Sequence, residues 1–479
     1  MSALVWIQRE FRVDYLPALQ TALEKHENVI VAYFHDVNHN LGGATKTWLA
    51  NALENLQQAY QARNGSLWIV DGDFQQEFEQ LVKDQNITQI YYSYQVGEGF
   101  FEPQQQVLDI CSEMKVGLTP FFSEDFFDPS EVKNLKGSPY LVFTPFYKNC
   151  MKQIDQVAPL HLTQKNLTKT AMVNVPKRHT RIPPNLVDTG NKKWASKILK
   201  YWQVGENSAW QQFDTFLENA IKEYDTDRNF PSVDATSRLS PYLHFGHVTP
   251  VSLYFYVQTK IETGELNEQQ IQPWIRQLFW RGFARYLLVW FPNKEKTEFN
   301  DKYAQLEWQK DDITLNHWQN GLTGIPIVDA GMRELWETGT MHNRVRMLVA
   351  SLLTKNLNID WREGLNWFAD TLLDADSANN SMGWQWVAGC GVDAAPYYRL
   401  FNPVVQSEKF DKQGEYIKKW VPELKPLSSK AVHEPWKHEL ECQMKGVTLG
   451  KDYPHPIVDL KKSREQHLSR VEALKNKAS

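Results

Sequence analysis

The sequence predicts an α/β N-terminal domain with a doubly wound parallel sheet, followed by an all-α C-terminal domain and joined to it by a long interdomain connection. Three observations predict this fold. Short apolar runs alternate with helical patterns over the first third, prolines recur in the stretch that follows, and helical periodicity then continues toward the C-terminus. A chain of 479 residues is long enough for more than one core. The expected domain boundaries are 1–125, 126–206 and 207–479.

The apolar runs of the first third are typical of buried strands. Strand and helix alternate in the order of a parallel sheet, which binds ligands at the carboxyl ends of its strands. The segment carries neither a Gly-x-Gly-x-x-Gly fingerprint nor a Walker loop, so it does not indicate a usual dinucleotide or P-loop site. The strands are expected at 4–7, 29–34, 67–70 and 89–92, and the helices between them at 17–25, 46–63 and 73–84.

The pattern changes twice after the first third. From residue 117 to 207 it loosens and prolines recur, which predicts a connection that runs over the surface. From residue 210 the apolar period becomes that of an α-helix and no fixed repeat is present. The clearest helices are expected at 210–225, 249–263, 268–289, 326–337, 342–355 and 361–373.

Composition argues against several classes of protein. A net charge of −5 does not indicate a nucleic-acid-binding protein, so a DNA partner requires a local basic surface. The apolar runs are too short to cross a bilayer, and the N-terminus does not read as a secretory signal, so we expect a cytoplasmic protein. The cysteines form no close pair, which argues against zinc and iron–sulfur centres; they are Cys111, Cys150, Cys390 and Cys442.

Tryptophan is the compositional outlier, with 18 residues. Such a number suits a large core, and it equally suits rings that stack on a planar ligand or carry electrons. Placement decides between these alternatives. On the expected helix 268–289, four side chains of mixed character lie on one side, which indicates a cavity rather than a core stripe; they are Trp274, Gln277, Trp280 and Arg281.

Two further segments combine hydroxyl and basic side chains with a helix start. Residues 234–243 place hydroxyls and an arginine before a proline-started helix, which suits a pyrophosphate as well as ordinary helix capping. In the segment that follows Gly339, Asn343, Arg346 and Met347 share one helical stripe, whereas Arg344 points about 100° away. One arginine can therefore face a buried carboxylate while the other faces solvent or phosphate.

The densest segment is 373–386. Its Asp-x-Asp pair suggests calcium, but the EF-hand pattern fails, since the sixth loop position is not glycine and the twelfth is not glutamate. If Trp384 and Trp386 lie on a helix, their rings point to opposite sides, about 200° apart. The sequence therefore predicts no metal site here.

Six strings stand out in order along the chain. They are Thr-Ser-Arg-Leu-Ser-Pro-Tyr-Leu (236–243), Trp-Gln-Asn-Gly-Leu-Thr-Gly-Ile-Pro-Ile-Val-Asp-Ala (318–330), Met-His-Asn-Arg-Val-Arg-Met (341–347), Asp-Trp-Arg-Glu-Gly (360–364), Gly-Trp-Gln-Trp (383–386) and Tyr-Arg-Leu-Phe-Asn-Pro (398–403). Together they resemble the photolyase/cryptochrome family, and within it the bacterial cyclobutane-dimer photolyases most closely. The resemblance runs over nearly the whole chain and is most specific from 224 to 410.

The resemblance implies FAD, folded into a U shape, inside the helical domain. Asp374 and Asp376 would meet the polar edge of the flavin ring, with Arg346 pairing Asp374, and Asn380 would place its amide at the flavin N5. The phosphates would be held by Tyr224, Thr236, Ser237, Arg238 and Ser240. The cofactor site would also include Leu239, Trp274, Arg281 and Asn343. A buried flavin needs such donors because its charge is costly to bury without partners.

The same resemblance implies repair of cyclobutane pyrimidine dimers in UV-damaged DNA, driven by blue light and by electron transfer from reduced FAD. Trp308, Trp361 and Trp384 match a relay of three tryptophans that carries electrons from the surface to the flavin. The lesion leaves the duplex to reach the flavin. Its pocket would be formed by Gln277, Trp280, Asn343, Arg344, Met347 and Trp386, with both tryptophans stacking on the thymines, and DNA phosphates would meet Arg228, Arg344 and Arg399.

Two positions depart from the pattern. Gln277 stands where these photolyases usually carry a glutamate, and Thr340 replaces a tryptophan. The alternative function is that of a cryptochrome-type photoreceptor, which senses blue light and signals without DNA repair; it would share every flavin residue. Gln277 favours this alternative, whereas the rest of the substrate pocket and the short C-terminal tail favour repair. Asn343 and Met347 stand where branches that repair 6-4 photoproducts need two histidines, which argues against that substrate.

The remaining expectations concern ligands and partners. The N-terminal domain is compatible with a second, antenna chromophore whose identity the sequence does not specify. Glu102 is a candidate contact for it, in a neighbourhood that departs from the folate-binding pattern. We further expect damaged DNA as the partner, no association with membranes, and a monomer.

Overall fold

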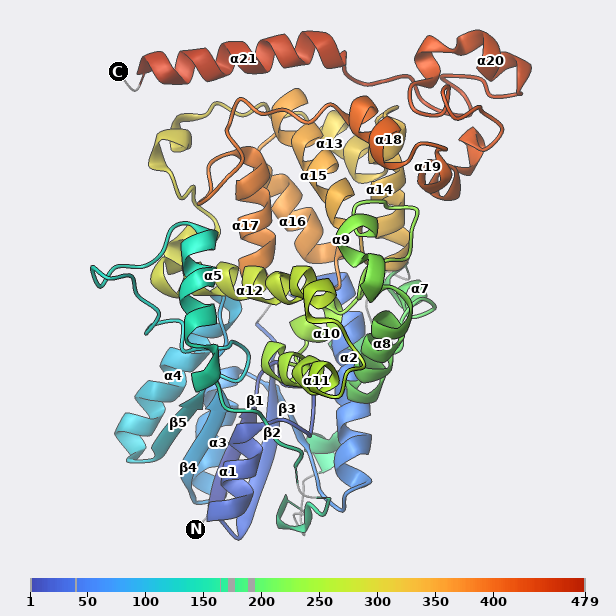
Figure 1. The fold of residues 1–479 in the computed structure, drawn as a ribbon. Coiled ribbons are helices and arrows are strands. Elements are labelled where there is room, and N and C mark those ends of the chain that lie inside the picture. The colour runs from blue at the N-terminus through green and yellow to red at the C-terminus, as the bar shows by residue number, and fades with distance from the viewer. Residues whose placement is uncertain (1, 39–40, 164, 171–176, 188–193, 478–479) are drawn as a thin grey trace. The chain divides into compact units, whose positions relative to one another are not determined.

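The computed structural model describes residues 2–38, 41–163, 165–170, 177–187 and 194–477. They divide into two compact units (Figure 1). The first unit comprises Met1–Lys222, Ser237–Pro292 and Leu373–Ala378, and the second comprises Glu223–Thr236, Asn293–Leu372 and Asn379–Ser479. The first unit therefore holds the N-terminal sheet together with several helices from the region that the sequence assigns to the helical domain. The domain boundaries at 125 and 206 stay predictions.

The first unit contains one sheet of five parallel strands in the order β3-β2-β1-β4-β5. This order confirms the predicted doubly wound sheet and its four predicted strands. The fifth strand, β5, was not predicted because Gly117 and Pro120 interrupt its apolar pattern. It lies at the sheet edge, where a proline is tolerated. The strands are β1 (Ser2–Ile7), β2 (Asn28–Asp36), β3 (Trp68–Gly72), β4 (Ile87–Ser93) and β5 (Gly117–Phe121).

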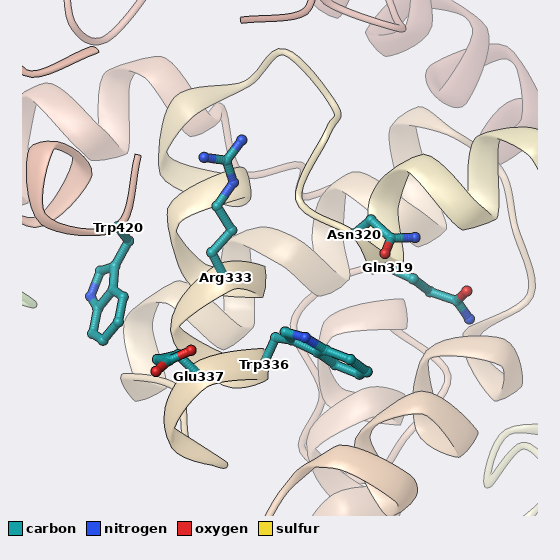
Figure 2. A pocket seen from close by; sticks show the side chains of 6 residues that line it. All are labelled: Gln319, Asn320, Arg333, Trp336, Glu337 and Trp420. Atoms are coloured by element: carbon teal, nitrogen blue, oxygen red, sulfur yellow. The ribbon is translucent and has the colours of Figure 1, made fainter. Parts of the chain in front are cut away.

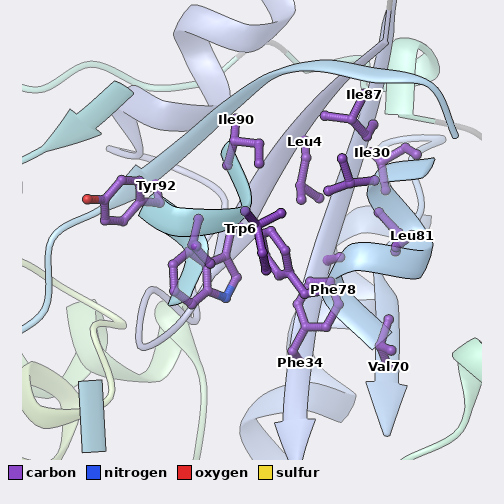
Figure 3. Packing of buried hydrophobic residues seen from close by; sticks show 14 of the residues in the cluster. Leu4, Trp6, Ile30, Phe34, Val70, Phe78, Leu81, Ile87, Ile90 and Tyr92 are labelled. Atoms are coloured by element: carbon purple, nitrogen blue, oxygen red, sulfur yellow. The ribbon is translucent and has the colours of Figure 1, made fainter. Parts of the chain in front are cut away.

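Four helices connect these strands. They are α1 (Pro17–Lys25), α2 (Gly43–Gln61), α3 (Phe74–Asp84) and α4 (Glu98–Met114), so the three predicted helices are confirmed and α4 is additional. Side chains alternate along a strand, and one set, which includes Leu4 and Trp6, faces α3 and α4 (Figure 3). There the Trp6 ring lies 5.5 Å from both Phe74 and Phe78. This aromatic cluster is the core on that face of the sheet.

The rest of the first unit is helical. The predicted connection contains α5 (Phe143–Lys152), α6 (Pro184–Val187) and α7 (Trp194–Ile198), so much of its described part is structured. It is followed by α8 (Glu206–Asn219), α10 (Ser240–His244), α11 (Pro250–Glu262) and α12 (Glu268–Trp290). Asn267 caps the long helix α12 by accepting a hydrogen bond from the Gln269 amide at 2.9 Å.

The second unit consists of helices. The predicted helix 342–355 is present as α15 (Asn343–Ser351) and continues into a π-helical turn at Leu352–Asn356. Asp360 caps α16 by accepting from the Arg362 amide at 2.9 Å. The other helices are α9 (Tyr224–Asp227), α13 (Asp312–Gln319), α14 (Pro326–Thr338), α16 (Trp361–Thr371), α17 (Ser377–Ala388, which begins in the first unit), α18 (Pro403–Phe410), α19 (Glu415–Trp420), α20 (Glu439–Met444) and α21 (Leu460–Lys477).

Two features are absent from the described residues. None of their helices is both long and apolar enough to cross a membrane. Over the same residues, no group of three or more His, Cys, Asp and Glu side chains is arranged to hold a metal ion.

Candidate active site

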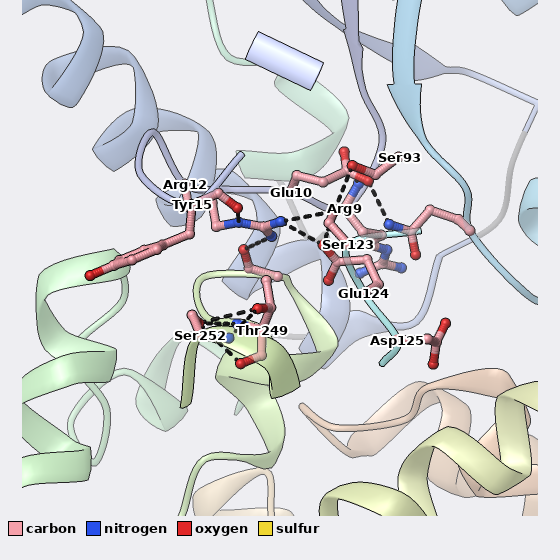
Figure 4. A network of polar contacts seen from close by, with 12 residues as sticks. Arg9, Glu10, Arg12, Tyr15, Ser93, Ser123, Glu124, Asp125, Thr249 and Ser252 are labelled. Atoms are coloured by element: carbon pink, nitrogen blue, oxygen red, sulfur yellow. Dashed lines mark hydrogen bonds and ion pairs between the residues drawn. The ribbon is translucent and has the colours of Figure 1, made fainter. Parts of the chain in front are cut away.

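The carboxyl edge of the sheet, where ligands of such folds bind, is filled by polar side chains in this protein (Figure 4). Arg12 is fully buried and pairs with Glu124 at 2.7 Å. Its remaining nitrogens donate to the Tyr15 and Gly246 carbonyls at 3.2 and 2.8 Å. Burial, and then the neighbouring Glu124, raise the pKa of Glu10 to about 7. The protein itself therefore satisfies all three guanidinium nitrogens of Arg12.

The segment before α10 carries the predicted phosphate contacts of the first unit. Arg238 adopts φ +52°, in the left-handed region that few non-glycine residues occupy, and its guanidinium lies 4.6 Å from the Trp202 ring centroid. The Ser237 carbonyl accepts from Gln212 at 3.2 Å. Leu239 is buried, whereas Ser240 is exposed at the start of α10. The segment thus presents a hydroxyl and a strained turn at a helix start.

The residues on the predicted polar and aromatic face of α12 differ in burial and in what they contact. Trp274 is 3% exposed and stacks on Phe213 at 4.8 Å, so it is part of the core. The Gln277 amide donates to the Pro273 carbonyl one turn earlier, at 3.0 Å. Trp280 is 36% exposed and stacks on Phe143 at 3.6 Å with an interplanar angle of 9°. One face of Trp280 is therefore covered by Phe143.

Arginines continue this face of α12 toward the Asp374–Asp376 segment. Arg281 donates to the Glu124 and Leu243 carbonyls at 2.9 and 3.2 Å. Arg285, one turn later, is 1% exposed and holds both oxygens of Asp125 from its Nε at 3.0 and 3.1 Å. Its Nη1 lies 3.7 Å from the Asp376 carboxylate. Sequence reasoning missed Arg285 and Asp125, although the spacing of four from Arg281 was an available signal.

Arg285 keeps one donor unused. Burial opposes its charge, but Asp125 and Asp376 outweigh that effect and raise the pKa of its guanidinium. Its buried Nη2 has no hydrogen-bond partner among the described residues. Since a buried donor without an acceptor is costly, this nitrogen fits a ligand that brings an acceptor atom beside Asp376. The carbonyl oxygens and N–H groups at the polar edge of a flavin have this chemistry.

A neutral histidine holds the segment that carries the two aspartates. Burial, and then Arg9, lower the pKa of His244 to about 4, and its Nδ1 lies 2.7 Å from the Leu373 carbonyl. Because a carbonyl accepts, this nitrogen carries the proton. The Asp376 amide donates to the Asp374 carbonyl at 2.7 Å, which closes a tight turn. Arg346 belongs to the second unit, so its pairing with Asp374 stays a prediction.

The predicted relay lies in the second unit. Trp384 is 2% exposed, Trp361 is fully buried, and Trp308 is half-buried. A Cβ on Gly364 of α16 would lie 2.0 Å from the Trp384 ring, so this position requires glycine and brings α16 against Trp384. Trp318, which sequence reasoning did not single out, packs 6.1 Å from the Trp384 ring. The relay residues therefore range from the interior to the surface.

The other predicted flavin contacts of the second unit are held by local hydrogen bonds. Asn380 donates from its amide to the Leu365 carbonyl at 3.1 Å, which fixes the side chain and leaves its oxygen available. Arg346 donates from Nε to the Met341 carbonyl at 2.8 Å. Tyr224 is buried, with the Arg228 guanidinium 5.4 Å from its ring centroid. Thr236 is half-buried.

The predicted lesion and DNA residues of the second unit differ in exposure. Asn343 is exposed, Met347 is half-buried, and the half-buried Trp386 ring lies 6.4 Å from Phe401. Trp384 and Trp386 thus differ in burial, as expected from their opposite directions on α17. Thr340, the second departure from the family pattern, is half-buried and lies 3.2 Å from the Thr338 hydroxyl.

The three predicted phosphate contacts also differ in their present partners. Arg228 pairs with Asp225 at 3.2 Å. The Arg344 guanidinium lies 3.6 Å above the Phe410 ring and donates to Asn229. Arg399 is exposed, with its guanidinium 5.2 Å from the Phe401 ring. Arg399 is therefore the most accessible of the three arginines.

A surface cavity of about 240 Å³ in the second unit lies apart from these assignments (Figure 2). Trp336, on its wall, stacks on Trp367 at 5.8 Å with an interplanar angle of 4°. Its lining contains no predicted site residue and consists of Gln319, Asn320, Arg333, Trp336, Glu337 and Trp420. The predicted antenna contact Glu102 lies exposed on α4 of the first unit.

Comparison with known proteins places these features in a family. Residues 3–165 match the family model described as DNA photolyase, and residues 274–473 match the FAD binding domain of DNA photolyase. The deoxyribodipyrimidine photo-lyase of Agrobacterium fabrum is 37% identical over 98% of this chain and 98% of its own length. A bacterial class III photolyase from Agrobacterium tumefaciens has a TM-score of 0.93 at 34% identity, covering 99% of this chain and 98% of the other.

A second structure comes from an archaeal relative. The photolyase of Sulfolobus tokodaii, described with two FAD molecules and a novel light-harvesting cofactor, has a TM-score of 0.82 at 25% identity and covers 99% of this chain and 100% of the other. The similarity of sequence and fold extends over nearly the full length in all three cases. Since 37% identity is maintained over 98% of the chain, this protein belongs to the DNA photolyase family.

Proposed function

We propose that this protein is a light-dependent deoxyribodipyrimidine photo-lyase that binds FAD and repairs cyclobutane pyrimidine dimers in UV-damaged DNA. The observation that carries the proposal is its similarity to such an enzyme over the full length, at 37% identity. The match to the FAD binding domain of the family supports FAD as the cofactor. The unused buried donor of Arg285 beside Asp376 is a feature of this chain that suits the cofactor's polar edge.

The family pattern supplies most of the residues that would bind the cofactor. Arg238, Ser240 and the start of α10 would hold its phosphates, and Asp376 would receive the ring N–H groups while Arg285 donates to a ring carbonyl. Asn380, already fixed by the Leu365 carbonyl, would direct its oxygen to the ring. When bound and reduced, FAD supplies the light-excited electron that opens the cyclobutane ring and is returned afterwards.

The substrate would approach the ring as a flipped-out dimer, because the reacting bonds are inaccessible within a stacked duplex. Trp280 would stack on one thymine with the face that Phe143 leaves open, and Trp386 would stack on the other. Gln277 would donate a hydrogen bond to the lesion with the amide hydrogen that Pro273 does not take. Arg344 and Arg399 would neutralise backbone phosphates on either side of the lesion.

Electrons would pass from the surface through Trp308, Trp361 and Trp384 and reduce an oxidised cofactor. Their burial supports this role, since Trp361 and Trp384 are buried whereas Trp308 is only half-buried. A second chromophore in the N-terminal part is in line with the archaeal relative described with a light-harvesting cofactor. We propose that the protein acts as a monomer on damaged DNA.

The test is purification in the dark, followed by a visible spectrum and a repair assay on dimer-containing DNA under blue light. We expect stoichiometric FAD and light-dependent restoration of the pyrimidines by the reduced enzyme. A folded protein that cannot be loaded with FAD would contradict the whole proposal. A flavin-loaded protein that neither prefers damaged DNA nor repairs it would point to the photoreceptor function instead.

A further inference from the structure

The three tryptophans of the proposed relay differ in what their indole N–H groups meet. Trp384 is 2% exposed, and its Nε1 has no hydrogen-bond partner within the described part of the chain. Trp361 is fully buried, and its Nε1 donates to a carboxylate oxygen of Glu298 at 3.2 Å. Trp308 is half-buried. The surroundings of the indole nitrogen therefore become better at stabilising a positive indole from Trp384 to Trp361.

Glu298 belongs to a small, partly buried charge cluster around Trp361. The carboxylate is 6% exposed in its side chain and pairs with Arg362 at 2.7 Å. Arg362 also binds both oxygens of Asp360 from Nη1, at 3.1 Å each. Two carboxylates and one guanidinium leave one net negative charge beside the ring. Burial opposes the charge of Arg362, but Asp360 and then Glu298 outweigh it and raise the pKa of the guanidinium.

The cluster contains one opposing interaction, because the Arg362 guanidinium lies 4.7 Å from the Trp361 ring centroid. A cation at that place disfavours a second positive charge on the ring. Two features reduce its effect. The Glu298 oxygen is closer, at 3.2 Å from the indole nitrogen, and Asp360 neutralises the guanidinium from its other side. The direct hydrogen bond to a charged acceptor therefore dominates.

We propose that Glu298 is a positioning residue of the electron relay, which stabilises the positive charge on oxidised Trp361 and so draws that charge outward from Trp384. This inference rests on the proposed function. Trp384 gives one electron to light-excited oxidised FAD, Trp361 restores Trp384 with one electron, and Trp308 restores Trp361. An external thiol returns one electron to Trp308, so one electron enters for each that leaves. The Trp361 proton stays on Nε1, because Arg362 already donates to the same Glu298 oxygen.

The experiment compares Glu298→Gln with the matched control Asp360→Asn. The first substitution removes the charged acceptor of the indole, whereas the second removes a charge from the same cluster that does not touch the indole. Asparagine keeps the helix cap that Asp360 provides. Trp361→Phe identifies the signal of Trp361 and measures what the relay loses without it. All variants are studied as holoenzyme in the dark and after a light pulse.

Two measurements are made on each variant. Ultraviolet resonance Raman spectra in the dark report the strength of the Trp361 hydrogen bond, and we expect it to weaken in Glu298→Gln alone. The yield of flavin photoreduction with an external thiol should fall roughly threefold to tenfold in Glu298→Gln, since hydrogen bonds to charged groups are about twice as strong as neutral ones. In Asp360→Asn the yield should stay within about twofold of wild type.

The outcomes separate this inference from the proposed function. An unchanged Raman signal, or an unchanged photoreduction yield, in Glu298→Gln would overturn the role of Glu298. Equal losses in Glu298→Gln and Asp360→Asn would overturn it too, because the effect would then belong to the cluster and not to the indole hydrogen bond. Wild-type photoreduction in Trp361→Phe would remove the relay and this inference with it. Failure of the proposed function would instead show as absent repair by chemically reduced wild-type enzyme.

Discussion

Two arginines of the first unit are buried to the same degree and differ in how completely they are satisfied. Arg12, at the carboxyl edge of the sheet, is 0% exposed, and each of its three guanidinium nitrogens has an acceptor. Arg285, on α12, is 1% exposed and pairs with Asp125 and Asp376, but its Nη2 has no partner within the described residues. All guanidinium nitrogens of Arg12 therefore have acceptors, whereas one donor nitrogen of Arg285 has none among the described residues.

This difference shows where a ligand is needed. Folding rarely leaves a buried donor unpaired, because its desolvation costs about 1–3 kcal/mol without return. At the sheet edge, where doubly wound folds usually bind, the buried pair of Arg12 and Glu124 is complete without a ligand (Figure 4). The Arg285 region carries an unmet hydrogen bond beside a carboxylate. The comparison therefore separates a structural network from a binding site within one compact unit.

The largest expected effect comes from exchanging the two arginines for methionine. Arg12→Met leaves Glu124 buried without its partner, and we expect a loss of about 3–5 kcal/mol in the free energy of unfolding. Arg285→Met should instead weaken FAD binding by about 100-fold or more, because it removes both the free donor and the partner of Asp376. Denaturant unfolding and flavin fluorescence titration measure the two quantities for both variants.

The distinction between the two arginines is wrong if Arg12→Met and Arg285→Met change stability and FAD binding in the same way. Arg285→Met also disturbs Asp125, so some loss of stability is expected from it. The decisive quantity is the stabilisation that saturating FAD adds to each folded variant, which depends on affinity and not on the stability of the empty protein. If FAD stabilises Arg285→Met as much as it stabilises wild type, the unused donor does not serve the cofactor.

Glu10, at the same edge of the sheet, should make the free energy of unfolding depend on pH. Burial and Glu124 raise the pKa of Glu10 to about 7, so the protonated form is favoured in the folded state. A raised carboxyl pKa contributes stability that is present below the unfolded pKa of about 4.3 and is lost as pH rises through 7. We expect this group to cost about 2–3 kcal/mol between pH 4.5 and 7.5, and Glu10→Gln to remove that part of the dependence.

The measurement is the free energy of unfolding of wild type and Glu10→Gln at several pH values across that interval. The difference between the two proteins should grow steadily with pH. Glu206, whose pKa burial also raises to about 7, remains in both proteins and contributes equally to each. A constant difference from pH 4.5 to 7.5 would show that Glu10 is charged throughout, stabilised by Gln95 and the backbone amides around it.

Much of the fold follows from patterns in the sequence, and the site follows less completely. The alternation of strand and helix predicted the parallel sheet and four of its strands, because both faces are buried and the apolar runs are continuous. It missed β5, whose Gly117 and Pro120 break the run, since pairing with β4 outweighs the local propensity. It also missed Arg285 and Glu298, because neither residue type nor spacing shows which side chains a distant segment will meet.

Local rules also misjudged single side chains. The mixed face of α12 indicated one cavity, yet Trp274 packs into the core against Phe213 and half of Trp280 is covered by Phe143. A helical pattern predicts which residues point the same way, but it does not predict which residues they pack against. The contacts came from α8 and α5, which lie more than 50 and 130 residues earlier in the chain.

A smaller effect tests whether the binding face of α12 extends two turns back from Arg285 to Gln277. We expect Gln277→Ala to weaken binding of dimer-containing DNA by about 1–3 kcal/mol, because a buried acceptor on the lesion would lose its donor. Gln277→Glu should keep FAD. With the neutral amide, lesion binding should vary little with pH at this position. The measurement is affinity for damaged against undamaged DNA in all three proteins.

Equal affinities of wild type and Gln277→Ala would confine the binding face to Arg281 and Arg285. The Pro273 carbonyl already occupies one amide hydrogen of Gln277 at 3.0 Å, so this outcome would mean that the second hydrogen points elsewhere. The assignment of the family would be unaffected by that result.

The smallest expected effect concerns Arg399 and Arg344 of the second unit. Arg399→Ala should reduce the salt dependence of DNA binding by about one counterion, because each neutralised phosphate releases about 0.9 of one. Between 50 and 200 mM salt this corresponds to about a threefold smaller loss of affinity. Arg344→Ala should show the same slope change with a larger loss of affinity, since its guanidinium also packs on Phe410.

Lys83→Ala, on the sheet-flanking helix α3, removes an equal charge where no DNA contact is predicted and should leave the slope unchanged. A slope reduced equally by all three substitutions would mean that net charge governs binding. In a protein with a net charge of −5, a response confined to Arg344 and Arg399 is what a local basic surface requires.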